Sequence, residues 1–394
     1  MPWKESSPMD QKTQFIADYL RHTLCFAELC ALYHVSRKTG YKWASRYEES
    51  GASGLADRSR RPHSSPHQTP AELIAAIVEA RGHHPTWGAK KLLAHLTRRD
   101  PGRPWPSRSV CCSILSRHGL IKQPRRRRPP GHPGKPSTLI TAPNEVWSAD
   151  FKGQFKTRDG RYCYPLTVTD NFSRFLLSCR ALTSVCVADS QVVFRTLFRE
   201  FGLPSRIRTD NGVPFATVSL ARLSRLSAWW VRLGVLPEFI EPGCPQQNGR
   251  HERMHRTLKA ETTRPPASGL RSQQRSFDRF RREYNEERPH EALEMQTPSS
   301  LYSPSPRPFP ERLPRLEYPA HYEKRYVSHN GGIRWNSGWI NVSITCAGEY
   351  VGLEEIDDGR WDVYFGPLKL GRLLEREMRI EDAHGKLWRH RKKV

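Results

Sequence analysis

The sequence predicts a multidomain protein with N-terminal all-α helix-turn-helix units, a central α/β domain with a mixed sheet and a C-terminal small β-barrel. Three observations predict this architecture. Amphipathic helical patterns dominate roughly the first third of the chain, strand-like runs alternating with helices follow, and short strands with Asn-Gly and Asp-Gly turns fill the end. A chain of 394 residues is long enough for several domains of ordinary size.

The composition narrows the class of partner. A net charge of +24 and a pI near 10.0 favour nucleic acid over an anionic membrane surface. No apolar run approaches the roughly 20 residues that a membrane span needs, and the start lacks the apolar core of a signal peptide. The nine cysteines are scattered and form no C-x-x-C pair, so we expect neither a disulfide framework nor structural zinc. The expected location is the cytoplasm, associated with the nucleoid.

The run FAELCALYHVSRKTGYKWASRYEE, from Phe26, has the pattern of a helix-turn-helix, with Ser36 as the N-cap of its second helix. The residues of that helix predicted to contact DNA are Arg37, Lys38, Tyr41 and Lys42. An ordinary helical hairpin with a solvated basic face is the alternative.

A second helix-turn-helix is predicted over 70–120. Thr69 is the expected N-cap of its first helix, with Pro70 in the first helical position. Its last helix begins at Ser107 and presents Arg108 to DNA, although a helical spacer domain is the alternative. The linker that follows, IKQPRRRRPPGHPGKP, has no acid, and its prolines prevent a helix. Arg125, Arg126, Arg127 and Arg128 make it either a phosphate-binding arm or a solvated tether.

From about residue 142 the pattern changes to three strand-like runs followed by alternating helices and strands. The expected domains are 1–52 (helix-turn-helix), 53–69 (linker), 70–120 (second, winged-helix-like helix-turn-helix), 121–141 (basic linker), 142–264 (α/β core), 265–317 (helix and Pro-rich connector) and 318–394 (small β-barrel and basic tail).

Three carboxylates stand out in the core. Asp150 lies on the first strand, Asp210 ends the fourth strand and Glu252 lies on a basic helix. If the two strands are neighbours and the helix crosses their ends, the three side chains converge. Converging carboxylates repel one another unless a cation joins them, and hard oxygen ligands select Mg²⁺ or Mn²⁺. Two such ions serve phosphodiester chemistry. Taken singly, an Asp at a strand end is usually a turn former, and a Glu in an arginine-rich helix is usually a salt-bridge partner, but the joint spacing and order of the three favour a site.

A helix starting near Asn248 places Asn248, Glu252, Arg256 and Lys259 on one face, because they are four, four and three residues apart. Glu252 would then hold metal while Arg256 and Lys259, with Asn248, hold DNA.

The motifs WSADFKG, LTVTDNFSRF, TDNGVPFA, PGCPQQNGRHERMHRTLK and REYNEERPHEAL, in this order, resemble the DDE transposases of bacterial insertion sequences, whose core is similar to retroviral integrase. The resemblance covers most of the chain and implies an RNase H-like core in which Asp150, Asp210 and Glu252 bind two Mg²⁺ or Mn²⁺ ions. It also implies that Arg256 and Lys259 grip the element's end, and that the 243–248 loop closes over DNA. The 41 residues between Asp210 and Glu252 exceed the spacing usual in retroviral integrases.

The expected function is therefore a DNA transposase that binds terminal inverted repeats and catalyses metal-dependent strand cleavage and strand transfer. Its partners would be double-stranded DNA, both repeats and target, and further copies of the chain in a dimer or larger assembly, with no membrane or nucleotide cofactor. One alternative is a repressor or inactive transposase that occupies the repeats without cutting. The other is an RNase H-type nuclease acting on RNA–DNA hybrids.

Overall fold

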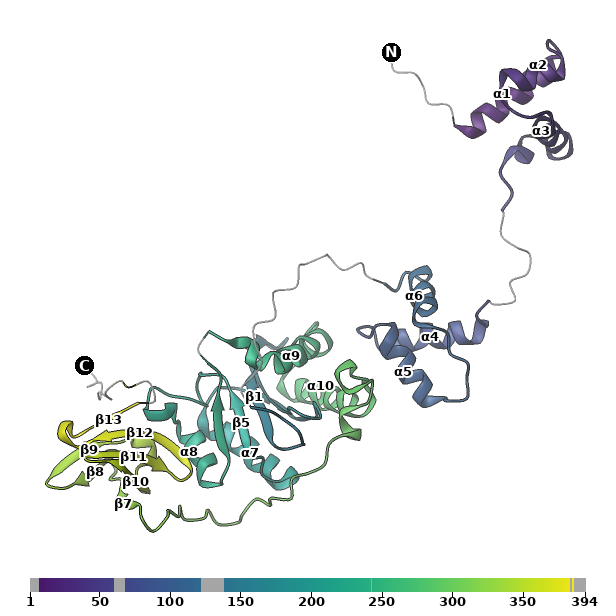
Figure 1. Cartoon of the computed structure of the whole chain (residues 1–394). Helices are drawn as coiled ribbons and strands as arrows, with labels where there is room; N and C mark the ends of the chain where they lie inside the picture. Colours follow the sequence, from purple (N-terminus) through teal and green to yellow (C-terminus); the bar gives the residue numbers. More distant parts are fainter. Residues whose placement is uncertain (1–6, 60–67, 122–137, 242, 383–384, 386–394) are drawn as a thin grey trace. The chain divides into compact units, whose positions relative to one another are not determined.

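A computed structural model of the chain describes residues 7–59, 68–121, 138–241, 243–382 and 385 (Figure 1). Its contacts divide the chain into two units, Met1–Thr69 and Pro70–Val394. Among the residues described, none of the helices combines the length and apolar character that crossing a bilayer requires.

The first unit is a three-helix domain with helix-turn-helix geometry. Its helices are α1 (Pro8–Arg21), α2 (Phe26–Leu32) and α3 (Arg37–Ser50), followed by a 3₁₀ turn, Gly51–Leu55. Ser36 caps α3 as predicted, because its hydroxyl accepts from the Thr39 backbone N–H at 3.2 Å. A Cβ at Gly40 would lie 2.6 Å from Cys30 Sγ, so the close approach of α3 to α2 requires glycine there.

A second helical domain opens the second unit. It consists of α4 (Ala71–His83), α5 (Ala89–Arg99) and α6 (Arg108–Arg117) around a core that includes Ile77, Trp87 and Ile114. Ser107 caps α6 as predicted. The predicted N-cap at Thr69 is wrong. Pro70 takes the cap position, because its extended backbone (φ −53°, ψ 143°) keeps it outside the helix.

The core is a six-stranded mixed sheet. Its strands are β1 (Val146–Phe151), β2 (Phe155–Lys156), β3 (Tyr162–Asp170), β4 (Leu176–Leu182), β5 (Arg206–Thr209) and β6 (Leu236–Phe239). The order β2-β3-β1-β5-β6, with β4 also paired to β3, makes β1 antiparallel to β3 and parallel to β5. The condition for bringing Asp150 and Asp210 together, that their two strands are neighbours, is thus met.

Two helical layers cover this sheet. On one side α7 (Val187–Phe201) and α8 (Arg225–Arg232) pack against the residues of β1 and β3 that include Trp147 and Val168. On the other side α9 (Gly249–Thr262) and α10 (Leu270–Arg282), which continues as a π-helical turn, Glu283–Glu287, pack in part against Cys163 and Cys179. Alternation along β1 therefore sends Trp147 and Ala149 to the first layer and Asp150 to the second.

The segment LARLSRLSAWWVRLG forms a shorter α-helix than predicted. A 3₁₀ turn, Leu220–Arg222, precedes α8, and Ala221 has a left-handed backbone (φ 51°) that interrupts any continuous helix. Ser224 then starts α8 through a reciprocal cap with Ser227.

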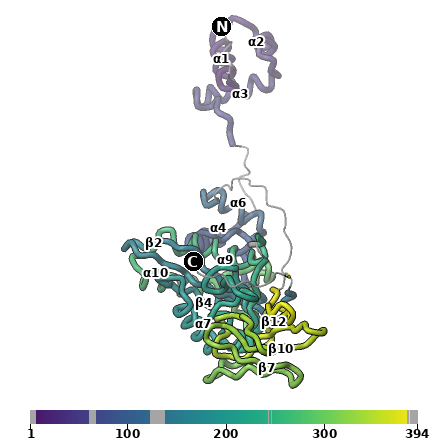
Figure 2. The backbone as a smooth tube through the Cα atoms, turned by 90° about the vertical axis from the view of Figure 1, so that its left-hand side faces the viewer, coloured from purple at the N-terminus to yellow at the C-terminus, as the bar shows by residue number. Residues whose placement is uncertain are grey.

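The C-terminal strands gather beside α8 (Figure 1), and Figure 2 shows β7, β10 and β12 grouped together. They are β7 (Glu323–Tyr326), β8 (Gly332–Trp335), β9 (Gly338–Asn341), β10 (Tyr350–Asp357), β11 (Arg360–Phe365), β12 (Leu368–Leu374) and β13 (Arg379–Glu381). Five of them form an antiparallel sheet in the order β13-β12-β11-β10-β7, and β8 pairs with β9. The predicted β-barrel is not confirmed, because no pairing among the described residues joins β13 to β7 and closes the sheet.

Short 3₁₀ turns, Glu291–Leu293 and Pro298–Ser300, follow the π-helical turn in the connector between core and C-terminal strands. Further 3₁₀ turns lie at Pro245–Asn248, Ile344–Cys346 and Glu375–Glu377.

Candidate active site

Asp150 and Asp210 lie at one edge of the sheet. The parallel register pairs Val146 with Arg206 and Ser148 with Arg208. Asp150 is two residues beyond Ser148, and Asp210 is two beyond Arg208, so both acids lie at the carboxyl ends of neighbouring strands. Asp210 is half-buried, and its Oδ1 accepts from the Gly212 backbone N–H at 3.1 Å.

The negative charges of Asp210 and Glu252 act on Asp150. Burial, with 21% of the side chain exposed, and the negative charge of Asp210 raise the pKa of Asp150 to about 7, and Glu252 adds to the rise. Lys152 and a hydrogen bond from the Phe151 backbone oppose it. Burial and the neighbouring carboxylates make the ionised form of Asp150 unfavourable. A divalent cation bound there would stabilise that ionised form.

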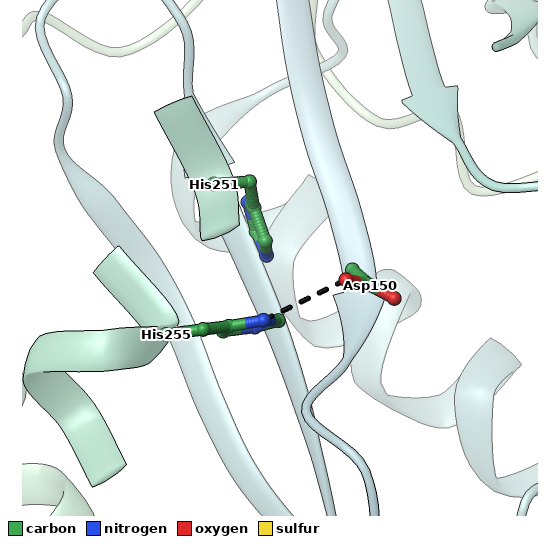
Figure 3. A group of neighbouring side chains, drawn as sticks. All are labelled: Asp150, His251 and His255. Carbon is green, nitrogen blue, oxygen red and sulfur yellow. Dashed lines mark ion pairs between the residues drawn. The ribbon is translucent and has the colours of Figure 1, made fainter. Parts of the chain in front are cut away.

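Two histidines of α9 flank Asp150 (Figure 3). Nδ1 of His255 lies 3.6 Å from Oδ2 of Asp150, and the possible ligand atoms of Asp150, His251 and His255 lie within 4.8 Å of one another. Burial lowers the pKa of His251 to about 3 and also lowers that of His255. Both imidazoles are therefore neutral at pH 7, and each keeps a nitrogen lone pair.

The threonines of β3 hold these histidines. Thr167 Oγ1 lies 2.7 Å from Nε2 of His251 and 2.6 Å from Nε2 of His255, and it donates to the Asp150 carbonyl at 3.1 Å. A hydroxyl has one proton, so while Thr167 donates to the carbonyl, both imidazoles must donate to it through Nε2. Nδ1 of His255 then carries the lone pair that faces Asp150. His251 Nδ1 is already engaged by Thr169 at 2.8 Å.

The sequence-based prediction did not include these four residues as partners of Asp150. The spacing of four between His251 and His255 places both on one helix face, and the alternation of β3 places both threonines on one sheet face. These spacings predict which residues share the helix face and which share the sheet face. They do not predict that the two faces pack against each other.

Helix α9 separates the residues that were predicted to share a face. Glu252, Arg256 and Lys259 are exposed, whereas Asn248 is 5% exposed and caps the helix with a non-helical backbone. Its buried Oδ1 has no hydrogen-bond partner within the described part of the chain. Asn248 is therefore not on the accessible surface with the other three.

The other residues predicted to contact DNA lie on α3, on α6 and in the basic linker. Arg37, Lys38, Tyr41 and Lys42 are exposed on α3, and Arg108 is exposed at the start of α6. Arg125, Arg126, Arg127 and Arg128 lie outside the described residues.

Asp170, at the end of β3, has a structural role. It is 1% exposed and accepts hydrogen bonds from the backbone N–H of Asn144, at 2.8 Å, and from both the backbone and the hydroxyl of Ser173. Its carboxylate is thus engaged in holding a turn and a neighbouring loop.

Comparison with known families agrees with this layout. Integrase core domain families match residues 140–245 and 233–298. A helix-turn-helix domain family matches residues 11–63, and a homeodomain-like domain family matches residues 39–115.

Individual relatives come from insertion elements. The chain is 31% identical, over 170 residues, to the insertion element IS407 uncharacterized 31.7 kDa protein of Burkholderia multivorans. The aligned region covers 41% of this chain and 57% of that relative. The chain is 27% identical to the IS476 uncharacterized 39.2 kDa protein of Xanthomonas euvesicatoria, over 70% of this chain and 72% of the relative.

Among solved structures, the simian T-cell lymphotropic virus intasome aligns with a TM-score of 0.36 and 18% identity, over 73% of this chain and 91% of that chain. Integrase core and helix-turn-helix domain families thus match this chain, and the relatives described above are insertion-element proteins. These similarities support an insertion-sequence DDE transposase with an integrase-like core.

Proposed function

We propose that this chain is a DNA transposase that binds the terminal inverted repeats of a mobile element and catalyses metal-dependent strand cleavage and strand transfer. The observation that carries the proposal is the electrostatic coupling of Asp150 to Asp210 and Glu252 at the end of β1 and β5. Three acids from two strands and one helix, beside exposed cations of α9, suit a site that must hold both metal and DNA.

Asp150, Asp210 and Glu252 would hold two Mg²⁺ or Mn²⁺ ions. The donor set fits, since carboxylate oxygens are the ligands these ions prefer, and burial of Asp150 makes its lone charge unfavourable without a cation. When bound, two such ions activate an attacking oxygen and stabilise a leaving oxygen in phosphodiester displacement. The buried network of Thr167, His251 and His255 packs against Asp150 and excludes water from the side of the carboxylate that faces α9.

The remaining predicted contacts supply DNA binding. Arg256 and Lys259 are exposed on the helix that carries Glu252, so they would grip phosphates next to the reacting bond. The exposed side of α3 and the start of α6 would read the terminal repeats, and the arginine linker would hold adjoining DNA. Because both ends of an element must be cut together, we expect a dimer or larger assembly on DNA.

A repressor or inactive transposase that occupies the repeats without cutting is the second candidate, since the helix-turn-helix units alone would support binding. Cleavage of a labelled duplex carrying the element's end, with Mg²⁺, tests the proposal by comparing the wild type with Glu252→Ala. We expect the variant to bind the DNA as well as the wild type but to lose cleavage by about a thousandfold or more. Glu252 is exposed, so its replacement should leave the unfolding temperature unchanged.

Equal cleavage by both proteins would remove Glu252 from the chemistry. Binding without cleavage by the wild type would favour the repressor.

A further inference from the structure

Four arginines form a ridge on α10, here called the arginine ridge: Arg271, Arg275, Arg279 and Arg282. With about 100° between successive helical residues, they fall within an arc of about 80°. That arc lies opposite the side of α10 that buries Phe277 and Phe280, and all four arginines are exposed. The ridge therefore faces solvent.

The ridge has no acidic partner. Across the described ranges, none of its four guanidiniums forms an ion pair with a carboxylate. The acid at its edge, Asp278, accepts a hydrogen bond from Gln274 Nε2 at 2.8 Å. Four like charges on one helix face repel one another, so the arrangement favours an anion that lies along them.

A surface hollow of about 660 Å³ adjoins the ridge. Arg158, Arg275 and Arg279 contribute to its lining. Two acids, Glu261 and Glu283, also line it, but both are engaged elsewhere. Glu261 pairs with Arg288 at 2.9 Å, and Glu283 with His84 at 2.8 Å. The cations of the hollow thus remain available to a ligand.

The ridge belongs to the same helical layer as the proposed catalytic helix. Helices α9 and α10 share an apolar core on the side of the sheet that Asp150 faces (Figure 1). Helix α9 exposes Arg253, Arg256 and Lys259 in that layer. From Arg271 to Arg282 the ridge spans about 16 Å, since a helix rises about 1.5 Å per residue. One strand of a duplex carries a phosphate about every 3.4 Å along its axis, so the ridge can lie beside several.

We propose that the arginine ridge binds the phosphate backbone of duplex DNA outside the segment that α9 holds at the three acids. The inference rests on the proposed function only in taking DNA as the partner. An anionic lipid surface would also attract arginines, but helices that lie on membranes anchor through large apolar side chains. Within the described residues, α10 contributes none of the exposed large hydrophobic side chains.

The test is the salt dependence of binding to a fluorescently labelled duplex of mixed sequence, measured with the full chain and without divalent metal. The variant is Arg275→Gln with Arg279→Gln. Each phosphate contact contributes about 0.9 to the slope of log K against log salt, so we expect the slope to become shallower by about 2. At a fixed moderate salt concentration we expect about tenfold weaker binding, because two charge-assisted contacts are lost.

The matched control is Arg195→Gln with Arg225→Gln. These arginines are exposed on α7 and α8, on the other side of the sheet, and make no ion pair within the described residues. The control should keep the wild-type slope, and all three proteins should unfold at the same temperature. An unchanged slope in the ridge variant, or an equal loss in the control, overturns the proposal.

Two further measurements separate the outcomes. Weaker binding of the ridge variant to vesicles of phosphatidylserine and phosphatidylcholine, with an unchanged DNA slope, would assign the ridge to lipid and overturn the proposal. Cleavage is followed separately with Glu252→Ala. A ridge effect without wild-type cleavage would sink the proposed reaction and leave the ridge standing, whereas normal cleavage without a ridge effect would do the reverse.

Discussion

The two faces of the central sheet differ in polarity: one is apolar, and the other carries buried polar side chains. Toward α7 and α8 the strands present Trp147, Ala149 and Val168, which pack with Phe194 and Trp230 in an apolar core. Toward α9 the same strands, β1 and β3, present Asp150, Thr167 and Thr169, which meet two buried histidines. Successive residues of one strand thus serve stability on one side and the proposed chemistry on the other.

This difference teaches where the fold gains and loses free energy. Apolar burial stabilises the α7 side at any pH. On the α9 side, the burial of a carboxylate beside other acids is unfavourable when that carboxylate ionises. The α9 side accordingly suits the cation that we propose, and the apolar side holds the α9 side in place.

The largest expected effect comes from the apolar side. Phe194 is fully buried and packs edge-on against Trp230, with 4.8 Å between ring centroids. Phe194→Ala should lower the free energy of unfolding by about 3–5 kcal/mol, because it leaves a cavity. Chemical denaturation at pH 6 and pH 8 should give the same loss. A loss that changed strongly with pH would show that the two sides are not independent.

A smaller effect of opposite sign is expected from Asp150→Asn. The folded-state pKa of Asp150 is raised to about 7, above its ordinary value of 3.8, so the folded state binds this proton more tightly than the unfolded state. Its contribution to stability is therefore present below pH 4 and lost as the pH rises to about 7. Without divalent metal, the variant should gain roughly 2–4 kcal/mol over the wild type at pH 8 and nothing below pH 4.

Denaturant titrations in the presence of a chelator measure this gain. Asp358→Asn, in an exposed turn, is the control and should change little at either pH. Saturating Mg²⁺ should shrink the advantage of Asp150→Asn, because only the wild type keeps this ligand. No gain at pH 8 would mean that Asp150 ionises freely.

The smallest effect is expected from the hydroxyl between the histidines. Thr167→Val keeps the shape but leaves two buried imidazole nitrogens without their partner, which should cost about 1–3 kcal/mol. Thr167→Ser should restore most of the loss. Thr196→Val, which removes an exposed hydroxyl of α7 bonded to the Val192 carbonyl, should stay within about 0.5 kcal/mol of the wild type. Equal losses of unfolding free energy in Thr167→Val and Thr196→Val would show that the hydrogen bonds between Thr167 and the histidines add no particular stability.

The sequence predicts local features well where one residue decides them. Ser36 and Ser107 cap helices as expected, because a serine before a helical pattern has an acceptor for the free N–H groups. Thr69 fails because the following proline remains extended and takes the cap position itself. Similarly, Asn248 matches the spacing of an exposed helix face, but as the cap it departs from helical geometry and turns inward.

Long-range features are predicted only where topology limits the choices. Asp150 and Asp210 were expected to converge if their strands were neighbours, and β1 does pair with β5. Nothing local shows which helix face meets which sheet face, so the contact of His255 with Asp150 was missed. Closure of the C-terminal strands likewise depends on pairing between the ends of the sheet, which turn motifs do not specify.

The alternation along β1 also limits how this protein can change in length. β1 is paired on both sides, to β3 and β5, so its register is held at two edges. Inserting or deleting one residue between Val146 and Asp150 would turn the acid toward the tryptophan layer and a neighbouring apolar residue toward α9. The segment from Asn211 to Leu223 carries no such paired strand beyond one isolated bridge, but it buries Phe215, Leu220 and Leu223. A change of length there is limited by the packing of these side chains, whereas in β1 it is limited by strand register.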